Sequence, residues 1–77
     1  MTVKLTTASG SIYELDVDGK RVRRLTGKIA PTPRQGADGE WKAFVTLHEV
    51  GDSLGFDWDG EGHCTFTSPV VKKEEVS

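Results

Sequence analysis

Apolar side chains at every second position mark most of this chain as β-strand. In residues 2–7, Val3 and Leu5 alternate with polar neighbours. A period of two is the spacing of side chains on one face of a strand. The same period predicts strands over residues 11–17, 20–25, 40–47, 53–58 and 63–68, and a short last strand over 70–71. No stretch has the apolar spacing of an amphipathic helix.

Turn residues separate the predicted strands. Asp18 and Gly19 lie between two strand-like runs, and this dipeptide favours a two-residue type I′ hairpin, in which both residues adopt positive φ. Residues 2–25 are therefore predicted to form an antiparallel meander. Residues 26–39 contain two prolines, three glycines and a single large apolar side chain, Ile29, and they are predicted to form a long loop.

About six short strands with frequent turns predict an all-β fold. We expect a small antiparallel barrel of the SH3-like type, or else a compact sandwich of two sheets. A chain of 77 residues allows one domain, placed here at residues 1–71, and residues 72–77 are predicted to be a charged, frayed tail. A core this small buries limited surface, so we also expect self-association.

Two large apolar side chains fall on the polar face of their predicted strands. These residues are Ile12 and Phe44. Exposed apolar residues that cluster mark an interface, whereas in a barrel they would close a second apolar side. In the later strands, Leu54, Phe56 and Trp58 are predicted to face the core, together with Cys64 and Phe66 of the following strand.

Charge is distributed unevenly although the net charge is only −2. Residues 20–34 contain no acidic residue and six basic ones: Lys20, Arg21, Arg23, Arg24, Lys28 and Arg34. Residues 43–71 contain five acidic residues and neither Lys nor Arg. In one interpretation the two segments pair across a sheet and neutralise each other. In the other, the six basic residues bind a carboxylate or a phosphate of a partner, because guanidinium groups contact such anions in bidentate fashion.

Cysteine usage and hydropathy favour a cytoplasmic protein. The single cysteine, Cys64, excludes an internal disulfide, and small secreted domains usually contain several. The first residues lack the apolar region of a secretory signal. No apolar run reaches the roughly 20 residues that span a bilayer.

Motifs for metal binding and catalysis are incomplete. Asp57, Asp59 and Glu61 have the spacing of the first half of a calcium loop, but the twelfth position is Ser68 instead of the required Glu. His63 and Cys64 are neighbours on a strand and point to opposite faces, so they cannot share a metal ion. No nucleophile elbow or phosphate-binding loop is present. We therefore expect an acidic turn, no cofactor, no metal and no enzymatic activity.

Four segments carry a family resemblance. They are residues 7–15 (TASGSIYEL), 21–25 (RVRRL), 31–34 (PTPR) and 67–71 (TSPVV). Together these segments resemble short β-rich accessory proteins of tailed bacteriophages. The resemblance implies a protein of the host cytoplasm that blocks a host factor or sequesters a small signal.

We therefore expect the protein to act by binding a partner or a ligand. The favoured interpretation is a non-enzymatic module that acts by protein–protein contact through the strand at 20–24 and the loop that follows it. A sponge for a nucleotide or another anionic small molecule is the main alternative, and a structural phage component is a third. Nucleic acid is less favoured, because Phe44 is the single candidate for stacking a base.

Overall fold

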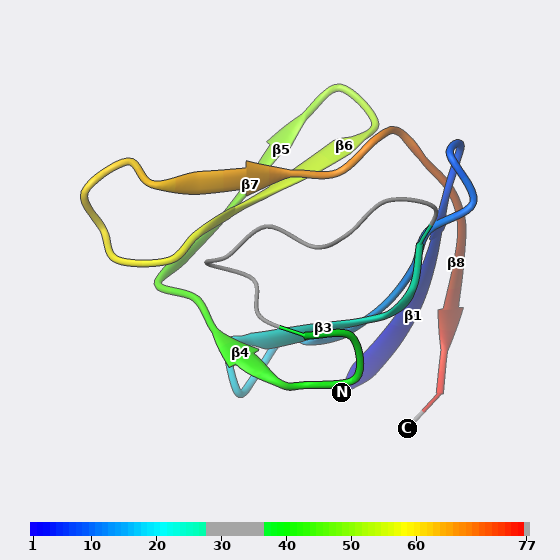
Figure 1. The fold of residues 1–77 in the computed structure, drawn as a ribbon, viewed down its shortest axis with the longest axis horizontal. Helices are drawn as coiled ribbons and strands as arrows, with labels where there is room; N and C mark the ends of the chain where they lie inside the picture. The colour runs from blue at the N-terminus through cyan, green and yellow to red at the C-terminus, as the bar shows by residue number, and fades with distance from the viewer. Residues whose placement is uncertain (28–36, 77) are drawn as a thin grey trace.

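The computed structural model describes residues 1–27 and 37–76, which form eight β-strands (Figure 1). The described residues include no helix, and so none that could cross a membrane. The strands are β1 (Thr2–Thr7), β2 (Ile12–Asp16), β3 (Arg21–Thr26), β4 (Lys42–Ala43), β5 (Thr46–Val50), β6 (Ser53–Asp57), β7 (Cys64–Phe66) and β8 (Val70–Glu75).

Two antiparallel sheets make up the fold. The larger sheet has the order β4-β3-β2-β1-β8, and the smaller has the order β5-β6-β7. Figure 1 shows the small sheet at the top of the view, facing the large sheet, which curves from β4 to β8. The all-β prediction is confirmed. Over the described residues the two sheets do not close into a barrel, and a small sandwich is the architecture that fits.

The second hairpin joins β2 to β3 through a loop of four residues, 17–20. Asp16 pairs with Arg21, and Lys20 is the loop residue with positive φ, at 50°. The predicted type I′ turn at Asp18-Gly19 is therefore wrong, although the hairpin itself is present. The Asp16 carboxylate accepts a hydrogen bond from the Gly19 N–H at 3.0 Å, and this local bond favours the longer loop.

The chain passes from one sheet to the other between Phe44 and Val45. The Phe44 N–H donates to the carbonyl of Lys20 at 2.9 Å, and the Val45 N–H donates to the carbonyl of Asp57 at 2.7 Å. This crossing divides the predicted strand 40–47 into β4 and β5 and resets the alternation of faces. Phe44 consequently enters the core, while Val45 is 49% exposed.

The core lies between the sheets around Phe56, which is 1% exposed. Its ring centroid lies 5.4 Å from Phe44, 5.8 Å from Trp58 and 6.5 Å from Tyr13. These are favourable distances for tilted and stacked aromatic pairs. The remaining buried apolar residues are Leu5, Leu15, Val22 and Leu54.

β7 presents the opposite face from the one predicted. Phe66 pairs with Gly55 and is 56% exposed, so its ring covers the outer side of the glycine. Thr65 faces inward, where its hydroxyl accepts a hydrogen bond from the Trp58 indole at 2.8 Å. The predicted inward placement of Phe66 and Cys64 is therefore wrong. Cys64 lies on the same face as Phe66 and is only partly buried.

The C-terminal segment is an edge strand rather than a frayed tail. β8 pairs with β1, with Lys4 opposite Glu74 and Leu5 opposite Lys73. The domain therefore extends through Glu75, beyond the predicted boundary at residue 71. Charged side chains are common on edge strands, since alternate residues project into solvent while the backbone pairs.

Candidate functional site

Two of the predicted binding arginines lie on the outer face of the large sheet. Arg21 donates to Asp16 at 3.0 Å, and Arg23 donates to Glu14 at 2.6 Å. Both guanidinium groups also stack on Trp41, at 4.5 Å and 4.7 Å from its ring. Each arginine is thus engaged by an acid on the neighbouring strand and by an aromatic ring.

A row of alternating charge crosses this outer face. Glu74 of β8, Lys4 of β1, Glu14 of β2 and Arg23 of β3 lie opposite one another in register. The acids that neutralise the outward-facing arginines of β3 therefore come from β2, and not from residues 43–71 as one sequence interpretation held. The row leaves little net positive charge for an external anion.

Arg24 faces inward and is 5% exposed. Its Nε donates to the Asp38 carboxylate at 2.7 Å, and the Gly39 N–H donates to the Arg24 carbonyl at 2.7 Å. The alternation that buries Val22 also buries Arg24, and the loop supplies its counter-charge. Of the other predicted basic residues, Lys20 is exposed in the loop of the β2–β3 hairpin, while Lys28 and Arg34 lie outside the described residues.

Ile12 and Phe44 do not form a shared interface. Ile12 is half-buried on the outer face of β2, between the buried residues Ser11 and Tyr13. Phe44 is 7% exposed and belongs to the core, so it is not an exposed ring for a partner. The physical reason is the crossing between the sheets at Phe44, which turns its side chain inward.

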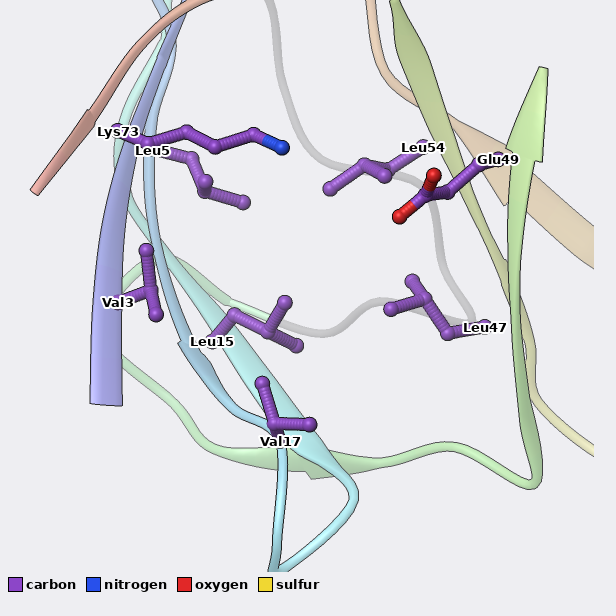
Figure 2. A pocket seen from close by; sticks show the side chains of 8 residues that line it. All are labelled: Val3, Leu5, Leu15, Val17, Leu47, Glu49, Leu54 and Lys73. Carbon is purple, nitrogen blue, oxygen red and sulfur yellow. The ribbon is translucent and has the colours of Figure 1, made fainter. Parts of the chain in front are cut away.

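An apolar cleft opens between the two sheets on the side of β8, an edge strand of the large sheet, and β5, an edge strand of the small sheet. Its volume is about 220 Å³. Figure 2 shows Lys73 and Glu49 pointing toward one another from opposite sheets at this cleft. The other lining residues are apolar: Val3, Leu5, Leu15, Val17, Leu47 and Leu54.

The strands beside this cleft have outer edges that pair with no other strand in the part of the chain that the structure describes. β8 pairs only with β1, and β5 pairs only with β6, among the described strands. Such an edge presents backbone N–H and C=O groups that can pair with another extended chain. Sequence reasoning missed this feature, because the edges are set by strand order, which alternation does not reveal.

A second cleft is lined mainly by residues that carry hydroxyl groups. Its volume is about 450 Å³, and Arg24 lies in its wall. Ser9 and Ser68 share a hydrogen bond of 2.7 Å at this place. The remaining lining residues are Ser11, Tyr13, Phe66 and Thr67. Hydroxyl groups beside a guanidinium are suited to a small anion, although Asp38 already neutralises Arg24.

The acidic segment after β6 forms a tight turn, as expected. Asp57 Oδ1 accepts the N–H groups of Asp59, at 3.3 Å, and Gly60, at 2.9 Å. Asp59 in turn accepts the Glu61 N–H at 2.8 Å and contacts His63. The bond from Glu61 contributes most to a lowered pKa of the Asp59 carboxyl. These carboxylates are held by the turn's own backbone.

Cys64 lies near Asp57 on the outer face of the small sheet, and His48 of β5 is close to both. Burial raises the pKa of the Cys64 thiol, and the negative charges of Asp57 and Asp59 raise it further. In the free protein the thiol therefore stays protonated at neutral pH. This grouping could not be predicted from residue spacing, because the three residues lie on three different strands.

Comparison with known proteins found no matching family model, no similar curated protein and no similar solved structure.

Proposed function

We propose that the protein is a non-enzymatic binding module that takes an extended segment of a partner protein along the outer edge of β5. Apolar side chains of that segment would enter the cleft between the sheets. The observation that carries the proposal is the position of this apolar cleft between β5 and β8, whose outer edges pair with no other described strand. Addition of a strand to a free sheet edge is a common mode of peptide recognition.

The size of the cleft favours side chains over a small molecule. Ligand pockets typically measure about 300–1,000 Å³ and enclose most of the ligand. This cleft has about 220 Å³ and is open on one side. It suits one or two aliphatic side chains, with the backbone of the segment held by main-chain hydrogen bonds at the edge.

Charge defines the partner segment further. Residues 43–71, which include the whole small sheet, contain five acidic residues and no Lys or Arg. A segment with apolar residues at alternate positions and net positive charge would complement this surface. The resemblance to phage accessory proteins suggests a host protein in the host cytoplasm as the source of the segment.

The proposal can be tested with a displayed library of extended peptides selected on the wild-type protein. Val17 lines the cleft and is 41% exposed, and Leu25 lies away from it with 38% exposure. The variants Val17→Lys and Leu25→Lys therefore make the same chemical change at matched exposure. We expect Val17→Lys to weaken peptide binding at least tenfold and Leu25→Lys to leave it within twofold.

Three outcomes would contradict the proposal. In the first, the selected peptides are acidic. In the second, they bind Val17→Lys as well as they bind the wild type. In the third, sedimentation shows a dimer that Val17→Lys dissociates, in which case the occupant of the cleft is a second copy of this chain. Self-association, expected from the small core, is thereby tested in the same experiment.

A sponge for an anionic small molecule is the second candidate, and the hydroxyl-lined cleft beside Arg24 is the observation that favours it. The volume of about 450 Å³ lies in the range of ligand pockets. A ligand that binds the folded state raises its thermal stability by mass action. Stabilisation by millimolar nucleotide that is lost in the Ser9→Ala/Ser68→Ala variant would establish this function in place of peptide binding.

A further inference from the structure

Three side chains of different ligand chemistry gather on the outer face of the small sheet. They are His48 of β5, Asp57 of β6 and Cys64 of β7. An imidazole nitrogen, a carboxylate oxygen and the thiol sulfur all lie within 4.8 Å of one another. This face lies opposite the one that lines the interlayer cleft, so the grouping is separate from the proposed peptide site.

Strand register brings the three residues together. Asp57 lies directly opposite Cys64 in the pair of β6 and β7. In the pair of β5 and β6, Asp57 lies opposite Thr46, and His48 lies opposite Gly55. His48 is thus the diagonal neighbour of Asp57 on the same face, at a distance that long side chains can bridge.

We propose that His48, Asp57 and Cys64 bind a divalent transition-metal ion of the zinc class, with the fourth coordination position open to solvent. Zinc takes imidazole, carboxylate and thiolate ligands at about 2.0–2.3 Å, which in a tetrahedral site places ligand atoms about 3.3–3.8 Å apart. Because the three ligand atoms lie within 4.8 Å of one another, they need to approach by no more than about 1–1.5 Å, which side-chain rotation supplies.

Asp57 is already oriented for this role. Its side chain is 8% exposed, and backbone N–H groups of Asp59 and Gly60 hold its Oδ1. Hydrogen bonds that fix a carboxylate before the ion arrives are typical of metal ligands. Residues 43–71 contain no Lys or Arg, so the small sheet has no cationic side chain other than histidine to balance this charge.

A neighbouring cluster provides an internal comparison. Asp59, Glu61 and His63 also place ligand atoms within 4.8 Å of one another, but all three are exposed and lie in the β6–β7 loop. This cluster has no thiol, and His63 is engaged by Asp59. The set on the strands has a thiol, a buried carboxylate and a more rigid support, and is therefore the stronger site.

Cobalt(II) titration of the full chain, with Cys64 kept reduced by a non-thiol reductant, tests the proposal. Cobalt replaces zinc in tetrahedral sites and shows a near-ultraviolet thiolate charge-transfer band. We expect this band in the wild type and its loss in Cys64→Ser. His48→Ala and Asp57→Asn should weaken cobalt binding at least tenfold, and His63→Ala should leave it within twofold. Added zinc should displace cobalt and slow alkylation of Cys64.

Asp57→Asn keeps the oxygen that accepts the two turn N–H bonds, and His48 is exposed, so both variants should fold. Circular dichroism checks this, and His48→Ala decides the question if Asp57→Asn is unfolded. Absence of a thiolate band in the wild type overturns the proposal. Cobalt affinity that is unchanged by His48→Ala, or that falls tenfold in His63→Ala, overturns it as well.

Discussion

Arg24 and Asp38 form an ion pair in which the arginine side chain is only 6% exposed and the aspartate side chain is 39% exposed. The pair joins the inner face of β3 to the residues that lead into β4. Removal of one partner from a buried pair typically costs about 3–5 kcal/mol, because the other charge stays buried. Water reaches Asp38, so the cost here should be smaller.

Replacement of this counter-charge should destabilise the fold. We expect Asp38→Asn to lower the free energy of unfolding by about 2 kcal/mol, because Arg24 keeps its charge without a carboxylate. Urea unfolding followed by tryptophan fluorescence measures the change. Asp18→Asn is the control: the Asp18 side chain is 79% exposed, and its substitution should stay within about 0.5 kcal/mol. Equal effects of the two substitutions would contradict the role given to Arg24.

Gly55 should be intolerant of a side chain because of Phe66. A Cβ atom at position 55 would lie 2.4 Å from the Phe66 ring, so the ring would have to move. We expect Gly55→Ala to destabilise the protein by about 1 kcal/mol, although alanine in a strand is usually more favourable than glycine. In the Phe66→Ala background the same substitution should become neutral or stabilising. A double-mutant cycle of unfolding free energies measures this coupling, and additive effects would contradict it.

Acid should weaken the β2–β3 hairpin through Asp16. The Gly19 N–H bond, and then Arg21, hold the pKa of the Asp16 carboxyl below its ordinary value. A group whose pKa is lower in the folded state stabilises the fold above its unfolded pKa, which is about 4, and this contribution is lost as the pH falls through the folded value. The stability difference between wild type and Asp16→Asn should therefore be present at pH 7 and should shrink toward pH 3. A stability difference between the two proteins that does not change with pH would contradict a lowered pKa of Asp16 in the folded state.

The outward-facing arginines of β3 should matter for stability more than for binding. Arg21→Gln/Arg23→Gln removes two cross-strand ion pairs and both cation–π contacts to Trp41. Partly exposed pairs contribute modestly, so we expect a loss of about 1–2 kcal/mol in unfolding free energy. Trp41 emission should shift to longer wavelength as its ring becomes more hydrated. Unchanged emission and stability would show that these contacts contribute nothing in solution.

The regular strands of this fold were predictable from alternation. Leu5, Leu15, Leu54 and Phe56 face the core as predicted, because each lies inside an uninterrupted strand. The predicted two-residue turn at Asp18-Gly19 has the wrong geometry. It nevertheless implies that Asp16 pairs with Arg21, and the observed four-residue loop produces the same pair.

The predicted side-chain directions are wrong where backbone hydrogen bonds between residues distant in sequence decide which way a side chain points. The crossing at Phe44 is set by bonds to Lys20 on one side, and by the Val45 bond to Asp57 on the other. The outward direction of Phe66 follows from its pairing with Gly55. The same limitation hid the interlayer cleft and the grouping of His48, Asp57 and Cys64, since both depend on strand order and register.

Binding of an extended segment along the edge of β5 can be tested by amide hydrogen exchange. Exchange would be compared for the free protein and for its complex with a peptide selected from the displayed library. We expect amides within residues 46–50 to become protected at least tenfold in the complex, and those of residues 21–26 to be unchanged. Protection of residues 21–26 with no change in 46–50 would contradict this expectation and return the binding site to the arginines of β3.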